Sequence, residues 1–178
     1  MRNSFSASSR RLAILAGAVL LAGCASYDGR GLQPGVSSAD DVMALMGTPA
    51  MQWQDADGRR QLAYPRGPEG LQTFMAFIDT QGRLERVEKV LDTPHFARIE
   101  PGKSDQAAIL RLLGPSQPQW TMYFERRDEL VWEWRFCDDW GQVARFDVLF
   151  DGMSGIVRTS YQRPELRGFG LSAPTCGH

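Results

Sequence analysis

The chain contains very little lysine, histidine and cysteine for its length. Lys89 and Lys103 are the only two lysines, so arginine supplies nearly all of the positive charge. The sequence has no CxxC pair, no HExxH motif and no glycine-rich phosphate-binding loop. These absences argue against the common metal and nucleotide sites. Cysteine occurs three times and histidine twice, as Cys24, Cys137, Cys176, His95 and His178.

A large excess of positive charge is also missing. The formal net charge of the 178 residues is −1, and removal of the three arginines in residues 1–23 would lower it to −4. A mildly acidic chain has no electrostatic reason to bind nucleic acid. Its hydrophobic content of 43% and charged content of 23% are typical of a globular domain.

An uncharged apolar segment lies close to the N-terminus. Residues 12–23, LAILAGAVLLAG, follow a segment with three arginines and no acidic residue. This run is shorter than the roughly 20 residues that span a bilayer. A basic segment before a short apolar run predicts a secretory signal over residues 1–23.

The signal ends in LAGC at residues 21–24, which resembles the lipobox of bacterial lipoproteins. The resemblance implies cleavage before Cys24, acyl chains on that cysteine and a tether over residues 24–31. Two or more acyl chains anchor a protein stably to a membrane. Because Ala25 and not aspartate follows Cys24, the family's sorting pattern implies the outer membrane, with the protein facing the periplasm. The alternative is an ordinary signal peptide with a chance cysteine.

Two segments of the chain repeat one another at an offset of 67 residues. They are LQPGVSSADDVMALMGTP at 32–49 and IEPGKSDQAAILRLLGPS at 99–116. Pro-Gly predicts a turn, and Ser37 and Ser104 are the predicted helix N-caps. Apolar residues at i, i+3 and i+4 predict one buried helix face. Gly47 and Gly114 then predict the helix ends.

Alternating apolar and polar residues follow each predicted helix. In the second copy Leu130, Trp132 and Trp134 alternate with other side chains, as in a half-buried strand. Each copy therefore reads as a helix followed by about three antiparallel strands. The sequence predicts an α+β fold of two tandem helix-plus-antiparallel-sheet modules, over 32–92 and 93–163, with an irregular C-terminal tail at 164–178.

The repeated pattern, PG-x-S before a helix and F-x-F-x-D-x-x-G in a hairpin, resembles the SmpA/OmlA lipoprotein domain. That domain has the fold of BamE in the β-barrel assembly machinery, and the tandem copy is similar to the β-lactamase inhibitor protein. The resemblance covers most of residues 31–161. It implies a non-enzymatic lipoprotein that binds or scaffolds proteins in envelope maintenance or outer-membrane protein assembly. The alternative is a proteinaceous inhibitor of a periplasmic or exogenous enzyme.

Candidate catalytic residues are few. His95 lies in the predicted linker between the modules and is expected to be solvated. Four carboxylates of the second copy could form a cation site or an acid pair, but turn formation explains Asp138, Asp139 and Asp151 better, and Asp147 alternates with apolar residues in a predicted strand. We therefore expect no catalytic residue, metal, cofactor or small-molecule substrate. These carboxylates are Asp138, Asp139, Asp147 and Asp151.

The remaining candidates concern a disulfide and a protein-binding surface. Cys137 and Cys176 could form a disulfide in an oxidising compartment or remain two free thiols. Most tryptophans of the second copy are expected in the core. Tyr123 and Trp140 are the predicted exposed aromatic residues for protein binding.

Overall fold

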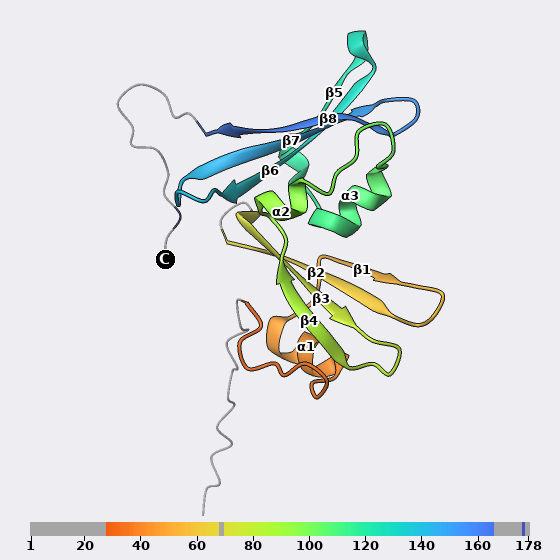
Figure 1. Cartoon of the computed structure of the whole chain (residues 1–178), viewed down its shortest axis with the longest axis vertical. Coiled ribbons are helices and arrows are strands. Elements are labelled where there is room, and N and C mark those ends of the chain that lie inside the picture. The colour runs from red at the N-terminus through yellow and green to blue at the C-terminus, as the bar shows by residue number, and fades with distance from the viewer. Residues whose placement is uncertain (1–27, 68–69, 166–175, 177–178) are drawn as a thin grey trace, which may run out of the picture.

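The structure is a computed structural model, and it describes residues 28–67, 70–165 and 176. This part of the chain is a mixed α/β structure with two antiparallel four-stranded sheets and few helices (Figure 1). None of the helices in these ranges is long and apolar enough to cross a membrane. The predicted signal and Cys24 lie outside the described residues.

Each sheet has its strands in sequence order. Sheet 1 follows α1 (Ala39–Met46) and contains β1 (Met51–Gln54), β2 (Arg60–Arg66), β3 (Gln72–Ile78) and β4 (Leu84–Lys89). The short α2 (Thr93–Phe96) leads to α3 (Gln106–Leu113) and to sheet 2. Sheet 2 contains β5 (Thr121–Phe124), β6 (Glu129–Cys137), β7 (Val143–Asp151) and β8 (Val157–Pro164). The 3-10 turns η2 (Pro118–Trp120) and η3 (Glu125–Arg127) flank β5.

The sequence predicted about three strands after each helix, and the structure has four. The missed strands, β1 and β5, have only four residues each. Such short segments contain too few residues for an alternating pattern to be recognised.

The helices α1 and α3 begin one residue later than predicted. Ser38 and Asp105 are the N-caps, and each side chain accepts a hydrogen bond from the backbone N–H three residues ahead, at 3.1 and 2.7 Å. The predicted caps Ser37 and Ser104 were therefore wrong. Their hydroxyls accept from the N–H four residues earlier, at 2.9 and 3.0 Å, and so close the Pro-Gly turn.

The same turn attaches to the edge strand of each sheet. The N–H of Gly35 donates to the carbonyl of Leu84 at 2.7 Å, and that of Gly102 donates to Val157 at 2.8 Å. Both glycines have a positive φ, which the tight turn requires. Pro-Gly, helix and hairpin therefore have the same local arrangement at both places in the chain.

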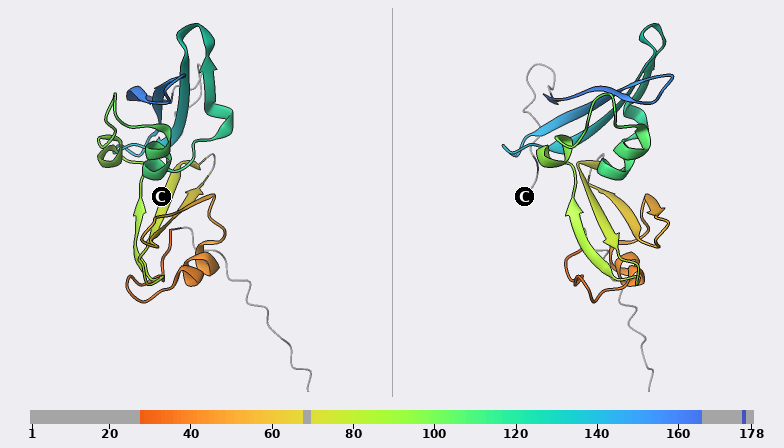
Figure 2. Two further views of the ribbon diagram at one scale, coloured as in Figure 1. Left: turned by 90° about the vertical axis from the view of Figure 1, so that its right-hand side faces the viewer. Right: turned by 45° about the vertical axis from the view of Figure 1, so that its right-hand side comes forward.

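The elements stack as alternating helical and sheet layers. Figure 1 shows α1, sheet 1, the α2–α3 layer and sheet 2 in that order, and Figure 2 shows the same order from two other sides. Val42 and Met46 of α1 pack on one face of sheet 1. That face carries Leu62, Tyr64, Phe74, Ala76, Ile78 and Leu84.

The C-terminal end of α3 packs closely on the other face of sheet 1. At Gly114, a Cβ atom would lie 2.9 Å from Thr73 Cγ2 and 3.3 Å from Met75 Cε. Beside it, the side-chain amide of Gln61 donates to the carbonyl of Arg111 at 2.6 Å. The α2–α3 layer therefore covers the face of sheet 1 that α1 leaves free.

The same helical layer also packs on sheet 2. Phe96 of α2 stacks on Phe146 with ring centroids 3.8 Å apart. Trp134 is 2% exposed, and its indole N–H donates to the carbonyl of Gly114 at 3.3 Å. Trp132 packs against the same core. The expectation that these two tryptophans belong to the core is confirmed.

The predicted tether and tail both differ from the structure. Gly29 is buried, and a Cβ there would lie 3.3 Å from Met46 Sδ and 3.5 Å from Val87 Cγ2. Residues 28–31 are therefore part of the folded chain and not a free tether. At the other end, Pro164 belongs to β8, and Glu165 bonds to Arg135 at 2.6 Å. Residues 166–175 and 177–178 lie outside the described residues.

Candidate functional site

Sheet 2 has one face against the α2–α3 layer and one face on which, among the described elements, only the short η2 lies, with Trp120 over Arg135 and Arg145. We call the second one the open face. Side chains alternate between the two faces of a strand, so the register of the sheet identifies its members. On β5 to β8 they include Met122, Phe124, Glu129, Val131, Glu133, Arg135, Arg145, Asp147, Leu149, Thr159, Tyr161 and Arg163.

One part of the open face is apolar and partly hollow. A groove of about 360 Å³ begins there and continues over the charged part of the face. Its apolar lining includes Met122, Val131, Leu149 and Tyr161, and its charged lining includes Glu133, Arg145, Asp147 and Arg163. Met122 is 55% exposed and Tyr161 is 48% exposed. Large apolar side chains that gather on a surface often mark a contact site for another molecule.

The other part of the open face is a network of ion pairs. Glu133 and Asp147 lie directly opposite one another on β6 and β7, and both are buried. Arg163 pairs with both carboxylates, at 2.7 Å to Asp147. Arg145 pairs with Glu133 and lies 3.4 Å from Glu165. Two like charges side by side are unfavourable, and these arginines offset that repulsion.

A tryptophan lies at the edge of this network. The guanidinium carbons of Arg135 and Arg145 lie 5.6 and 5.2 Å from the ring centroid of Trp120, which is within cation–π distance. Tryptophan and arginine are the residue types that contribute most often to binding energy in protein interfaces.

The network changes the proton affinity of its members. Burial raises the pKa of Glu133, and its hydrogen bond with Asp147 raises it further, against the opposing charges of Arg145 and Arg163. Burial tends to lower the pKa of Arg163, but the hydrogen bond and charge of Asp147 outweigh burial and raise it. Since each carboxylate is already bonded to arginine, the pair is better suited to holding the face together than to proton transfer.

Cys137 and Cys176 form a disulfide, with an S–S distance of 2.00 Å and 5.9 Å between the Cα atoms. The backbone N–H of Cys176 also donates to the carbonyl of Gly141 at 3.0 Å. This crosslink attaches residue 176 to the β6–β7 hairpin, at one end of sheet 2.

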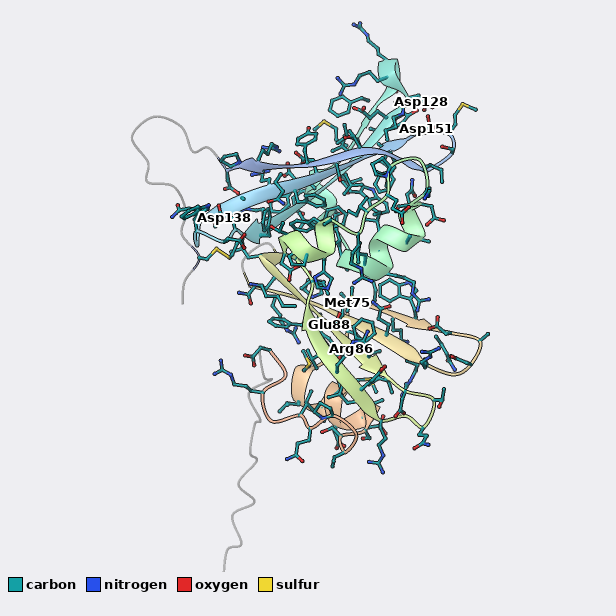
Figure 3. All side chains as sticks on the ribbon, viewed as in Figure 1. Met75, Arg86, Glu88, Asp128, Asp138 and Asp151 are labelled. Atoms are coloured by element: carbon teal, nitrogen blue, oxygen red, sulfur yellow. A yellow bond between two sulfur atoms is a disulfide. The ribbon has the colours of Figure 1, made fainter. Side chains whose placement is uncertain are left out.

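Tyr123 and Trp140, the aromatic residues predicted to bind protein, are both exposed but lie far apart. Tyr123 is 52% exposed, and its hydroxyl donates to Asp128 at 2.5 Å, which raises the tyrosine pKa. It pairs with Leu130 and so lies on the helix side of sheet 2, not on the open face. Trp140 is 86% exposed at the hairpin beyond the other end of β6. Figure 3 shows these two ends at the labels Asp128 and Asp138.

The four carboxylates considered as a cation site or acid pair do not converge. Asp138 accepts from two N–H groups in the β6–β7 turn, at 2.8 and 3.0 Å. Asp151 accepts from the N–H of Ser154, which with Arg158 lowers its pKa. Asp147 lies in the middle of β7, as its alternation with apolar residues predicted. Within the described ranges, no three His, Cys, Asp or Glu side chains are placed to hold a metal ion.

His95 is not solvated as predicted. Its side chain is 15% exposed, with Nδ1 2.5 Å from Asp92 and Nε2 3.6 Å from Glu88. It lines a cleft of about 420 Å³ between sheet 1 and the helical layer. Arg86 and Arg111 in this cleft are paired with carboxylates.

Sequence reasoning missed the open face itself. Glu133, Arg145 and Asp147 alternate with apolar residues, and this pattern could have placed them together on one face. Comparisons with known protein families, curated proteins and solved structures found no match to this chain.

Proposed function

We propose that this protein is a non-enzymatic lipoprotein, anchored at the outer membrane through Cys24, that binds another envelope protein through the open face of sheet 2. In this proposal the chain is a tandem duplicate of the BamE-like SmpA/OmlA module, related in arrangement to the β-lactamase inhibitor protein. Its role lies in envelope maintenance or outer-membrane protein assembly. It needs no cofactor, nucleic acid or small-molecule substrate.

One observation carries the proposal. Both faces of sheet 1 are covered within the described chain, whereas the open face of sheet 2 presents apolar, aromatic and arginine side chains to solvent. The lipobox-like sequence at 21–24 and the PG-x-S repeats support the lipoprotein part. The arginine-paired carboxylates support a binding role over a catalytic one.

Site-specific photocrosslinking in cells tests the binding surface. A photoreactive amino acid at Met122 is expected to give a protein adduct. The matched control is Val36, which is 60% exposed beside α1, far from the open face, and should give none. In a second variant, Tyr161→Glu is combined with the photoreactive amino acid at position 122. The yield of adduct should fall at least fivefold, because the new negative charge would lie in the apolar part of the groove.

The identity of the adduct separates the two functional classes. Subunits that assemble or maintain the outer membrane would support the proposed role, and Cys24→Ser should then abolish the adduct. A single soluble enzyme, captured with or without Cys24, would favour the inhibitor alternative. Equal adducts at Met122 and Val36 would contradict the open face as the binding site.

A further inference from the structure

We propose that the turn of the β6–β7 hairpin is a second docking site, in which Trp140 inserts into an apolar pocket of a partner protein whose rim is positively charged. The turn spans residues 138–142, DDWGQ, and we call it the tryptophan tip. None of its residues lines the groove of the open face. Figure 3 shows Asp138 and the disulfide at one end of sheet 2, and Asp128 and Asp151 at the other.

The side chain of Trp140 lies outside the packed core. Trp140 is 86% exposed, whereas Trp134 in the same sheet is 2% exposed. Among the described residues, the Trp140 ring has no aromatic or cation–π contact and its indole N–H has no hydrogen bond. A tryptophan buries about 150–250 Å² when it is enclosed, and its N–H then usually finds a partner. The tip therefore offers a large apolar surface and one free hydrogen-bond donor.

Hydrogen bonds hold the backbone of the tip in one conformation. The carboxylate of Asp138 accepts from the N–H groups of Trp140 and Gln142, at 3.0 and 2.8 Å. The N–H of Asp138 donates to the carbonyl of Gln142 at 2.9 Å, and the N–H of Gly141 donates to the carbonyl of Asp138 at 3.0 Å. Gly141 has a φ of +70, which glycine adopts without strain. The backbone that carries Trp140 is therefore fixed before any partner arrives.

The disulfide braces the base of the tip. Cys137 is the last residue of β6, directly before the tip, and is bonded to Cys176. The N–H of Cys176 donates to the carbonyl of Gly141 at 3.0 Å, so residue 176 is attached on both sides of the turn. A loop that is already held in its bound conformation loses less conformational entropy on binding. Tryptophan is also among the residue types that most often dominate the binding energy of protein interfaces.

The charge of the tip selects the kind of partner. The tip contains two acidic residues and no basic residue. The carboxylate of Asp138 is bonded within the turn, whereas Asp139 is exposed and has no hydrogen bond or ion pair among the described residues. A free carboxylate next to Trp140 is complementary to a lysine or arginine at the rim of a pocket. It opposes contact with anionic lipid headgroups, which attract basic segments. The occupant is therefore a protein pocket and not the bilayer.

Site-specific photocrosslinking in cells tests the tip with the full chain. A photoreactive amino acid replaces Gln142, which is exposed two residues from Trp140, and is expected to give a protein adduct. The matched control position is Met153, which is 91% exposed in the hairpin at the other end of sheet 2 and should give none. Combining the probe at position 142 with Trp140→Ala should lower the yield of adduct about tenfold, because the inserted side chain is lost.

Charge variants at Asp139 test the rim of the partner's pocket. Asp139→Asn should lower the yield about twofold and Asp139→Arg about tenfold, because the second change places two positive charges against one another. Replacing both Cys137 and Cys176 by alanine should lower the yield about threefold, because the tip is no longer braced. A yield that rises with Asp139→Arg would contradict a positively charged rim, and an unchanged yield without the disulfide would contradict its bracing role.

A stability measurement separates lost contact from lost folding. Thermal unfolding of Trp140→Ala should match that of the wild type, because the side chain lies outside the core. An adduct that persists with Trp140→Ala, or equal adducts at positions 142 and 153, would overturn the tip as a docking site. Adducts with phospholipid would show that the tip lies in the bilayer and would overturn it as well. The probe at Met122 reports on the open face separately, so failure at one position is distinguishable from failure at the other.

Discussion

The two sheets have similar construction but different neighbours. Ala63 and Met75 lie opposite one another in sheet 1 and are fully buried against α3. Tyr64 of sheet 1 corresponds to Trp134 of sheet 2. The residue before each of them therefore also corresponds, and in sheet 2 this residue is Glu133, which lies opposite Asp147. Apolar residues occupy the face that receives the next helix, and an ion-pair network occupies the face that receives none.

Stacking order explains this difference. Each long helix packs on the sheet that follows it in the chain, and α3 also covers the free face of the preceding sheet. No helix among the described residues follows β8, so within the described chain sheet 2 has no counterpart of the cover that α3 gives to sheet 1.

The first prediction breaks the contact that distinguishes the sheets. Gly47 and Gly114 end the two long helices with the same backbone, at φ +84 and +77, which strains any other residue. At Gly114 a Cβ would also meet sheet 1, whereas at Gly47 nothing lies within 4 Å. We expect Gly114→Ala to lower the free energy of unfolding by about 4 kcal/mol, from strain and overpacking together.

Gly47→Ala is the matched control and should cost only about 1–3 kcal/mol, from backbone strain alone. Urea denaturation of both variants measures the difference. Equal losses would mean that α3 does not pack tightly on sheet 1, and the layer order described above would need revision.

The second prediction removes the covalent link that only sheet 2 has among the described residues. The Cys137–Cys176 disulfide has a sequence separation of 39 residues. Replacing both cysteines by alanine should lower the free energy of unfolding by about 2–4 kcal/mol, because the unfolded chain is no longer constrained. Reductant should lower the stability of the wild type similarly and leave the variant unchanged. A variant as stable as the oxidised wild type would contradict this account.

Much of the local structure was predictable from sequence, and the layer order was not. The Pro-Gly turns, the apolar helix faces and the ends at Gly47 and Gly114 are encoded within about 20 residues, so pattern analysis found them. The contact of Gly114 with Met75 joins residues 39 positions apart, and no local pattern reports it. The ion-pair network likewise needs the register of three strands. For this reason the sequence placed Asp147 in a strand but did not reveal its pairing with Arg163.

The third prediction compares two corresponding core aromatic residues. The hydroxyl of Tyr64, under α1, is buried and is without a hydrogen-bond partner in the described structure, whereas the indole N–H of Trp134 donates to Gly114. Burial raises the pKa of Tyr64 accordingly. A buried unsatisfied group costs about 1–3 kcal/mol, so Tyr64→Phe should raise the free energy of unfolding by about 1 kcal/mol. Trp134→Phe should lower it. Thermal and urea unfolding would show both signs, and a destabilised Tyr64→Phe variant would indicate an unseen partner for the hydroxyl.

The smallest effect is expected at the β7–β8 hairpin of sheet 2. The N–H of Ser154 and the guanidinium of Arg158 hold the pKa of Asp151 well below its usual range. A carboxyl whose pKa is lower in the folded state stabilises the fold above its unfolded pKa of about 3.9. That stability is lost as the pH falls further. As the pH falls from 5 to below about 3.9, the free energy of unfolding of Asp151→Asn should therefore decrease less than that of the wild type.

Asp139→Asn is the control for this last prediction. Asp139 is exposed in the β6–β7 turn, at the opposite end of β7, with no hydrogen bond or ion pair among the described residues. Its replacement should leave the acid-side slope of stability unchanged. Because the Asp151 side chain is 33% exposed and that of Arg158 is 37% exposed, solvent screens their ion pair, and the change in slope should be the smallest of the effects considered. If both variants change the slope equally, acid sensitivity reflects the net charge of the chain and not the specific bonds of the sheet 2 hairpin.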